Sequence, residues 1–215
     1  MNIDLIILIT HSLLAIVSLF FGFLIYFHGR ESATNRFFAF VALGITLWSV
    51  GNFIAFRETA ELAVLGARIL FVAVSFQIFF ITLFAYTFPS SEFKIETSWK
   101  RYALWIGGIA LPIMGFFSFR RPDEFIESFL YGGRIFFLPQ PSPLIVLWNI
   151  ITFILSIVAA VLIFKKYRKA EGEMRQHLRI ITFAIVLDFL ILPFILSIPF
   201  QAFHNVIPNI YGPLA

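Results

Sequence analysis

The chain has 215 residues, of which 60% are hydrophobic and only 13% are charged, about half the charged fraction of ordinary soluble domains. This length allows one domain and leaves no room for a soluble catalytic domain beside the apolar stretches. Cysteine is absent, which excludes disulfides, thiol catalysis and cysteine-based metal sites. These totals are typical of an integral membrane protein.

Six apolar stretches, each long enough to cross a bilayer, follow one another along the chain. A hydrocarbon core about 30 Å thick requires about 20 helical residues, and continuous apolar runs favour helices over barrel strands, which alternate in polarity. The expected spans are residues 3–27, 37–56, 61–88, 102–119, 145–164 and 180–199. The predicted fold class is therefore all-α, a polytopic membrane helical bundle that forms one domain over residues 1–215.

The longest connection, residues 120–144, follows the fourth span. Its β-prone runs 125–131 and 134–138 flank Gly132-Gly133, and a two-residue Gly-Gly turn between such runs is typical of a hairpin. We therefore predict a small outer β-hairpin between spans four and five, packed across the helix ends because a lone hairpin is marginally stable. The alternative is an irregular aromatic loop at the membrane interface.

Residues 209–215 follow the sixth span and end in Gly-Pro-Leu-Ala. Proline is well tolerated in the first turn of a helix, so this segment predicts the start of a seventh span. The expectation is six spans present out of seven, with a native end as the alternative.

The orientation follows from the distribution of basic residues among the connections. With the N-terminus outside, the inner connections 28–36, 89–101 and 165–179 hold eleven of the sixteen Lys and Arg residues, and the outer ones hold four. This positive-inside bias predicts a multi-pass cell-membrane (inner or plasma membrane) protein with its N-terminus outside. The basic residues are then expected to face acidic lipid headgroups, and nucleic acid is not an expected partner.

Polar residues within the spans are the candidate functional residues, because ionisable groups in a membrane interior are costly. Most of them fall in the outer half, where Arg68 supplies the cation of a predicted pocket for a small anionic or polar ligand. The predicted ligand-binding residues are Arg68, His11, Asn52, Trp48, Asn149 and Asp188. The structural alternative is an Arg68–Asp188 or Arg68–Asp4 ion pair that only satisfies buried charge.

No catalytic motif is visible, and no cofactor is predicted. The four histidines are spread over both sides of the membrane, so they do not predict a metal site. The chain is therefore not expected to be an enzyme in itself.

Several short motifs point to a family. The run 35–49 (NRFFAFVALGITLWS), Ala67-Arg68 in the next span, the 86–89 run YTFP and the 175–179 run RQHLR together resemble the seven-helix N-terminal sensor region of prokaryotic histidine kinases. Tyr167-Arg-Lys-Ala170 fits the same pattern, and Tyr211-Gly-Pro-Leu-Ala215 resembles the entry to that family's seventh helix.

The resemblance implies a sensory input module of a two-component system. Such a receptor would detect an external or membrane-borne small ligand and relay it to a cytoplasmic kinase output in cis, as a homodimer. Two alternatives remain open on the residues alone: a small permease or channel subunit, with Arg68 and Asp188 lining its path, and a scaffold that only anchors and dimerises an enzyme.

Overall fold

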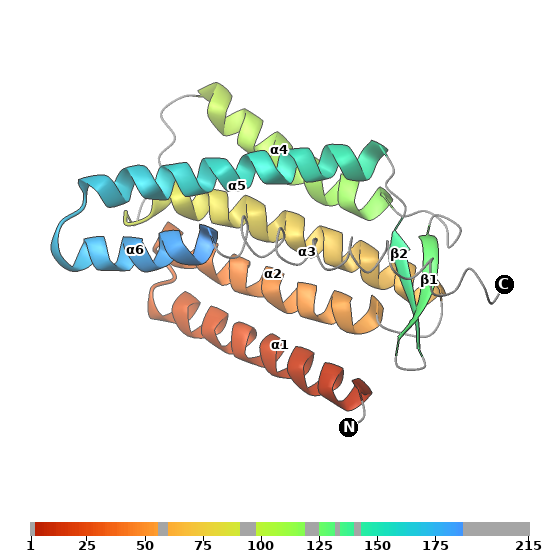
Figure 1. Cartoon of the computed structure of the whole chain (residues 1–215). Coiled ribbons are helices and arrows are strands. Elements are labelled where there is room, and N and C mark those ends of the chain that lie inside the picture. Colours follow the sequence, from red (N-terminus) through yellow and green to blue (C-terminus); the bar gives the residue numbers. More distant parts are fainter. Residues whose placement is uncertain are drawn as a thin grey trace. The chain divides into compact units, whose positions relative to one another are not determined.

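The computed structural model describes residues 3–55, 60–90, 98–118, 125–131, 134–139 and 143–186 (Figure 1). Helices account for most of these residues, as a chain with so many apolar stretches requires in lipid. The helices are α1 (Ile3–His28), α2 (Ala33–Ala55), α3 (Ala60–Thr87), α4 (Ser98–Phe117), α5 (Pro143–Lys169) and α6 (Gly172–Val186). The chain divides into two compact units, Met1–Leu155 and Ser156–Ala215, which are described separately below.

The described helices account for four of the six predicted spans by length and composition. Among the described residues, four helical segments are both long and apolar enough to cross a bilayer: Leu8–His28, Ala33–Ala55, Val64–Thr87 and Pro143–Lys169. The apolar part of α4, Tyr102–Phe117, would be about 24 Å long at 1.5 Å per residue, shorter than a typical bilayer core. Most of the predicted span 180–199 and all of the predicted seventh-helix start at 209–215 lie outside the described residues.

A pair of short strands follows α4 in the chain. Strands β1 (Phe125–Tyr131) and β2 (Arg134–Pro139) run antiparallel, with a register irregularity between Phe125 and Glu127. Two strands alone are marginally stable and form no layer of the architecture. The outer β-hairpin that the sequence prediction included in the fold class is therefore withdrawn from it, and the corrected class is an all-helical membrane bundle.

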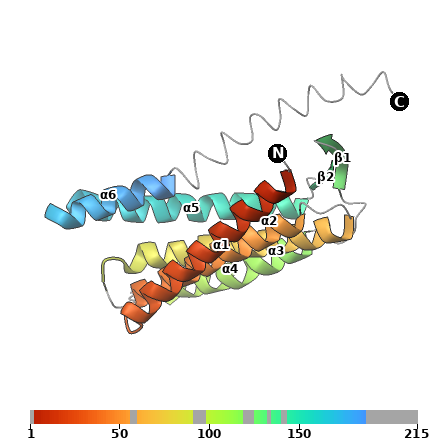
Figure 2. The same cartoon turned by 90° about the horizontal axis from the view of Figure 1, so that it is seen from below.

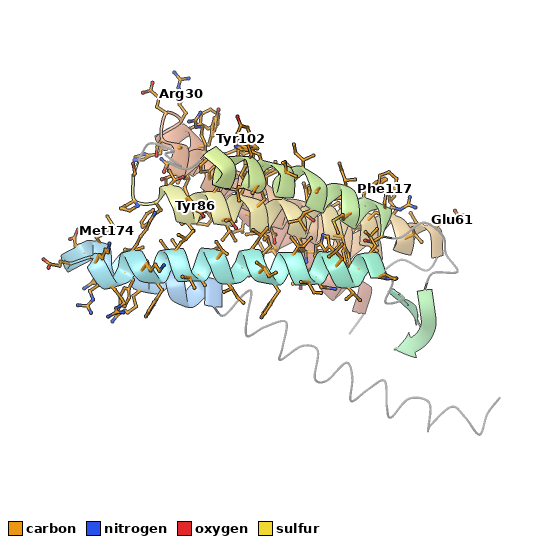
Figure 3. All side chains as sticks on the ribbon, turned by 90° about the horizontal axis from the view of Figure 1, so that it is seen from above. Arg30, Glu61, Tyr86, Tyr102, Phe117 and Met174 are labelled. Atoms are coloured by element: carbon orange, nitrogen blue, oxygen red, sulfur yellow. The ribbon has the colours of Figure 1, made fainter. Side chains whose placement is uncertain are left out.

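Within the first unit, successive helices run antiparallel, and each of α1 to α3 packs against the next one. Figure 1 and Figure 2 both show α1 beside α2. Figure 3 shows Glu61 and Phe117 at one end of the unit and Arg30 and Tyr102 at the opposite end. We call the end with Glu61 and Phe117 the outer end, following the orientation expected from the basic residues.

Small residues bring α2 and α3 into close contact. A Cβ atom added at Gly51 would lie 2.8 Å from the backbone nitrogen of Leu70, and one added at Gly66 would collide with the backbone of Ala55. Close backbone approach at small residues is the usual way in which membrane helices associate, because lipid removes the hydrophobic driving force between them. These two helices therefore form the tightest described pair in the unit.

Helix α1 uses a single narrow seam. Only one row of its described side chains from Leu8 onward is buried or half-buried, and its members recur every three or four residues: His11, Ala15, Ser18, Gly22 and Ile25. This spacing defines one helix face. Gly22 in this row approaches Ala42 of α2, where an added Cβ would lie 2.9 Å from the alanine Cβ. The remaining apolar face of α1 is exposed in the protein and suits lipid contact.

Helix α3 is the centre of the unit. Its Phe79, Phe80 and Leu83 form a buried cluster with Val41 of α2 and Leu104 of α4. At the end opposite the outer one, the Thr34 hydroxyl donates a 2.6 Å hydrogen bond to the carbonyl oxygen of Ser90 and ties the start of α2 to the chain after α3.

The second unit contains the end of α5 and helix α6. Gly172 begins α6 with a φ of +57°, a left-handed conformation that glycine adopts without steric cost. Ile163 and Leu178 are buried, with 0% and 1% of their surface exposed. A short turn connects the two helices, and a 3.3 Å hydrogen bond from the Ala170 amide to the Tyr167 carbonyl oxygen closes it.

Candidate ligand-sensing site

Two groups of polar and aromatic side chains lie near the outer end of the first unit. One is on the α1–α2 seam, and the other surrounds α3 on the side of α4 and α5. The antiparallel order of the helices explains why residues far apart in the sequence reach the same end.

The α1–α2 group contains His11, Trp48 and Asn52. The His11 and Trp48 rings are stacked, with centroids 6.3 Å apart and planes 23° apart. The Ser49 hydroxyl donates a 2.9 Å hydrogen bond to the His11 carbonyl oxygen, while the Asn52 amide donates one of 2.9 Å to the Trp48 carbonyl oxygen on its own helix. Two of the predicted residues, His11 of α1 and Trp48 of α2, therefore meet, and Ser49, which was absent from the prediction, joins the two helices there.

Arg68 is half-buried on α3, and its guanidinium carbon lies 5.3 Å from the centre of the Phe116 ring of α4. A cation over an aromatic face is attracted to the ring's quadrupole by about 0.5–2 kcal/mol, depending on desolvation. The sequence prediction identified the cation but not Phe116. No local pattern could have shown this pairing, because it depends on how α4 packs against α3.

Trp148 of α5 makes the most buried polar contact of this site. Its indole nitrogen donates a 2.8 Å hydrogen bond to the Ser75 hydroxyl oxygen, and that hydroxyl donates one of 2.7 Å to the Phe71 carbonyl oxygen. Trp148 is 5% exposed and Ser75 is 0% exposed. The Phe71 and Trp148 rings pack with centroids 4.5 Å apart. Trp148 and Ser75 were not among the predicted site residues.

The residues of this second group share one face of α3. Arg68, Phe71 and Ser75 are separated by three and four residues, which places them in one row along the helix. Phe71 also packs closely on Gly115 of α4, where an added Cβ would lie 3.1 Å from the Phe71 Cβ. We call Arg68, Phe71, Ser75, Phe116 and Trp148 the α3 outer cluster.

The two groups lie on different sides of α3. Gly66, Leu70 and Ala73 of α3 face α2, as their approaches to Ala55, Gly51 and Gly44 show. The row with Arg68 is offset from that row by two residues, or about 200° around the helix at 100° per residue. The structure therefore does not bring Arg68 together with His11, Trp48 and Asn52.

The last two predicted site residues stand apart. Asn149 is exposed, and its amide donates a 3.0 Å hydrogen bond to the Ile145 carbonyl oxygen of its own helix. Asp188 lies outside the described residues, so the predicted Arg68–Asp188 pair does too. Within the described part of the chain, no group of three His, Asp or Glu side chains is arranged to hold a metal ion.

Comparison with known proteins identifies one family. The family model described as the N-terminal 7TM region of histidine kinase matches residues 11–210, which include both polar groups and the α5–α6 turn. No curated protein sequence gives a significant match to the chain.

Proposed function

The chain belongs to the family of N-terminal seven-transmembrane regions of histidine kinases, and from this premise we propose that its α3 outer cluster receives the signal. Membership makes the chain a sensory input module of the membrane, in a region that is itself non-catalytic and that works with a cytoplasmic kinase domain.

The observation that carries the proposal is the position of Arg68. A guanidinium within a membrane span is costly and is retained mainly where it has a function or a specific partner. Here it lies over Phe116 and one turn from Phe71, whose ring packs on Trp148. A cation beside aromatic rings suits a small ligand with a carboxylate or phosphate and an apolar body, since arginine binds such anions through paired hydrogen bonds.

We propose that the relay is a shift between two packings of the helices. An anion on Arg68 competes with the Phe116 ring and favours a packing in which α4 moves relative to α3. A ligand shifts such an equilibrium only by its difference in affinity for the two states, so a change at Arg68 must alter that difference. Trp148 connects this site to α5, the helix whose other end carries the basic turn to α6.

The remaining parts of the proposal concern the setting. We propose that the N-terminus lies outside a plasma or inner membrane, because the connections 28–36, 89–101 and 165–179 hold eleven of the sixteen Lys and Arg residues and basic connections favour the inner side. The functional form is a homodimer with the kinase output in cis, in which the helix shift changes the activity of the kinase.

The test compares Arg68→Leu and Arg68→Lys in the kinase that carries this region, reconstituted in nanodiscs. A panel of small carboxylates, phosphates and fatty acids is screened by the change in autophosphorylation and in tryptophan emission. The response of Arg68→Leu to an active compound should fall by more than tenfold, and Arg68→Lys should keep part of it because lysine retains the charge without the planar fork. Arg36→Gln, an exposed arginine at the opposite end, is the control.

Two results would contradict the proposal. An unchanged response in Arg68→Leu, with normal expression and folding, would leave the region as a membrane anchor or place the ligand elsewhere. Uptake or conductance by vesicles that contain only this chain, lost in Arg68→Leu, would favour the permease or channel alternative instead.

A further inference from the structure

A dense group of basic side chains surrounds the α5–α6 turn of the second unit, remote in sequence from the α3 outer cluster. We propose that this turn is a binding site for the headgroups of anionic phospholipids. Five of its basic side chains are exposed and one, Lys166, is half-buried; the set is Lys165, Lys166, Arg168, Lys169, Arg175 and Arg179. Only Glu171 and Glu173 oppose them between residues 165 and 179.

The basic residues form one short row on each helix. On α5, Arg168 and Lys169 follow Lys165 by three and four residues, and on α6 Arg179 follows Arg175 by four, so each set shares a helix face. Each row covers about 6 Å along its axis at 1.5 Å per residue. The headgroup region on each side of a bilayer is about 5–8 Å thick, so both rows fit within it.

The turn fixes the two rows relative to each other. The guanidinium carbon of Arg175 lies 5.3 Å from the centre of the Tyr167 ring, which joins the first turn of α6 to the last turn of α5. The Ala170–Tyr167 hydrogen bond and the left-handed Gly172 close the connection between them. Basic side chains held in place lose less entropy on binding a phosphate than those of a mobile loop.

The apolar neighbours of the arginines favour lipid over an acidic protein surface. Ile180 lies beside Arg179 and is 64% exposed, and Met174 lies beside Arg175 and is 36% exposed (labelled in Figure 3). Cationic side chains next to exposed apolar ones are typical of elements at the membrane interface. Clusters of four to eight basic residues beside a membrane helix bind anionic headgroups, and arginine pairs with phosphate through two hydrogen bonds.

This inference goes beyond the general positive-inside bias, which orients a chain during insertion without selecting a lipid. A built site should prefer phosphatidylglycerol to phosphatidylcholine, and the preference should depend on these residues more than on other basic residues. It does not rest on the proposed ligand site at Arg68, so either can fail without the other.

The test is a titration of the purified chain in neutral detergent with phosphatidylglycerol or phosphatidylcholine, followed by native mass spectrometry of the lipid-bound species. The first phosphatidylglycerol should bind at least about 25-fold more tightly than phosphatidylcholine, and Arg168→Gln/Arg175→Gln should lose most of this preference, about fivefold for each charge removed. Tyr167→Leu, which keeps every charge but removes the ring that holds Arg175, should lose part of the preference for phosphatidylglycerol.

The matched control is Arg30→Gln/Arg36→Gln, which removes two exposed arginines at the α1–α2 turn and should keep the preference. Equal loss in both double variants would mean that general surface charge acts without a site, and the proposal would be wrong. It would also be wrong if the unsubstituted chain did not prefer phosphatidylglycerol. The proposal would also be wrong if Arg168→Gln/Arg175→Gln kept the lipid preference but lost affinity for an acidic protein domain. The turn would then be a protein-docking surface.

Discussion

Helices α1 and α3 are equally apolar, yet they occupy different environments. Their membrane-spanning segments have the same mean hydropathy of 2.3, but 6% of the α1 segment is buried against 56% of the α3 segment. The difference in burial arises because small residues, such as Gly51 and Gly66, let neighbouring helices pack closely against α3. Helix α3 has close neighbours on two faces, whereas α1 touches α2 along a single row. Hydropathy therefore identifies both helices as membrane segments but does not tell the central helix from the peripheral one.

The contrast extends to the polar residues. Arg68, Ser75 and Gln77 of α3 are buried or half-buried, and Thr82 on the same helix is fully buried. A polar side chain in a lipid-facing helix would have to find its partners within its own backbone, while one in a central helix can reach neighbouring helices, as Ser75 reaches Trp148. The central position of α3 is thus what makes the proposed site possible, and the following predictions test that contrast.

The largest effect is expected from Gly66→Ala. The added methyl group would collide with the backbone of Ala55, which cannot move without separating α2 from α3. Overpacking of this kind should lower the free energy of unfolding by about 3 kcal/mol, measured by circular dichroism during denaturation in mixed micelles. The control is Gly107→Ala on α4, where an added Cβ meets nothing within 4 Å. Equal stability of the two variants would contradict the close approach of α2 and α3.

The second prediction compares two leucines. Leu83 of α3 is 0% exposed and Leu13 of α1 is 60% exposed. Leu83→Ala should lower the free energy of unfolding by about 2 kcal/mol, the lower end of the range for core leucines, because lipid is as apolar as the protein interior and mainly the packing term remains. Leu13→Ala should change it by less than about 0.5 kcal/mol. A similar cost for both would mean that α1 is covered by protein on its outward face.

The third prediction concerns the link between α3 and α5. Trp148→Phe removes the indole donor but retains an aromatic ring against Phe71, so it should cost about 1 kcal/mol, the usual value of one hydrogen bond. The double variant with Ser75→Ala should cost less than the sum of the two single variants. Trp105→Phe, at a 43% exposed position, is the control. Fully additive costs would show that Trp148 and Ser75 do not interact in the membrane.

The sequence predicted the helices well and their neighbours poorly. Continuous apolar runs define the helices because lipid forces every backbone group into an internal hydrogen bond. By length and composition α4 falls short of a bilayer core, because its apolar run ends at the charged Lys100-Arg101 and the polar Ser118. Most of the predicted sixth span lies outside the described residues, so the number of spans stays a prediction. The fold class was corrected to all-helical because the two short strands, although they lie close to the predicted residues, supply no layer of the fold.

The candidate site shows where sequence reasoning stops. Depth along each helix follows from counting residues, so His11, Trp48 and Arg68 were all assigned to the outer half. Rotation about each helix axis decides which of them meet, and it is set by the glycines and alanines through which the helices approach. The row of Gly66 and Ala73 on α3 marks the face toward α2, and Arg68 lies on the other side. That spacing was visible in the sequence, whereas the partners Phe116 and Ser75 depended on the packing of α4 and α5.

The smallest expected effect concerns the attachment of α1. Ser49→Ala removes the 2.9 Å hydrogen bond from the Ser49 hydroxyl to the His11 carbonyl oxygen. Hydrogen bonds between membrane helices contribute about 0.6 kcal/mol on average, because the separated helices also find partners, so the loss should be close to that value. Thr10→Ala, at an exposed position of α1, is the control and should cost less. A loss above about 2 kcal/mol in Ser49→Ala would mean that α1 is held as firmly as a central helix, since no single bond on a lipid-facing seam should be worth so much. The contrast between α1 and α3 would then have to be explained by something other than the number of their neighbours.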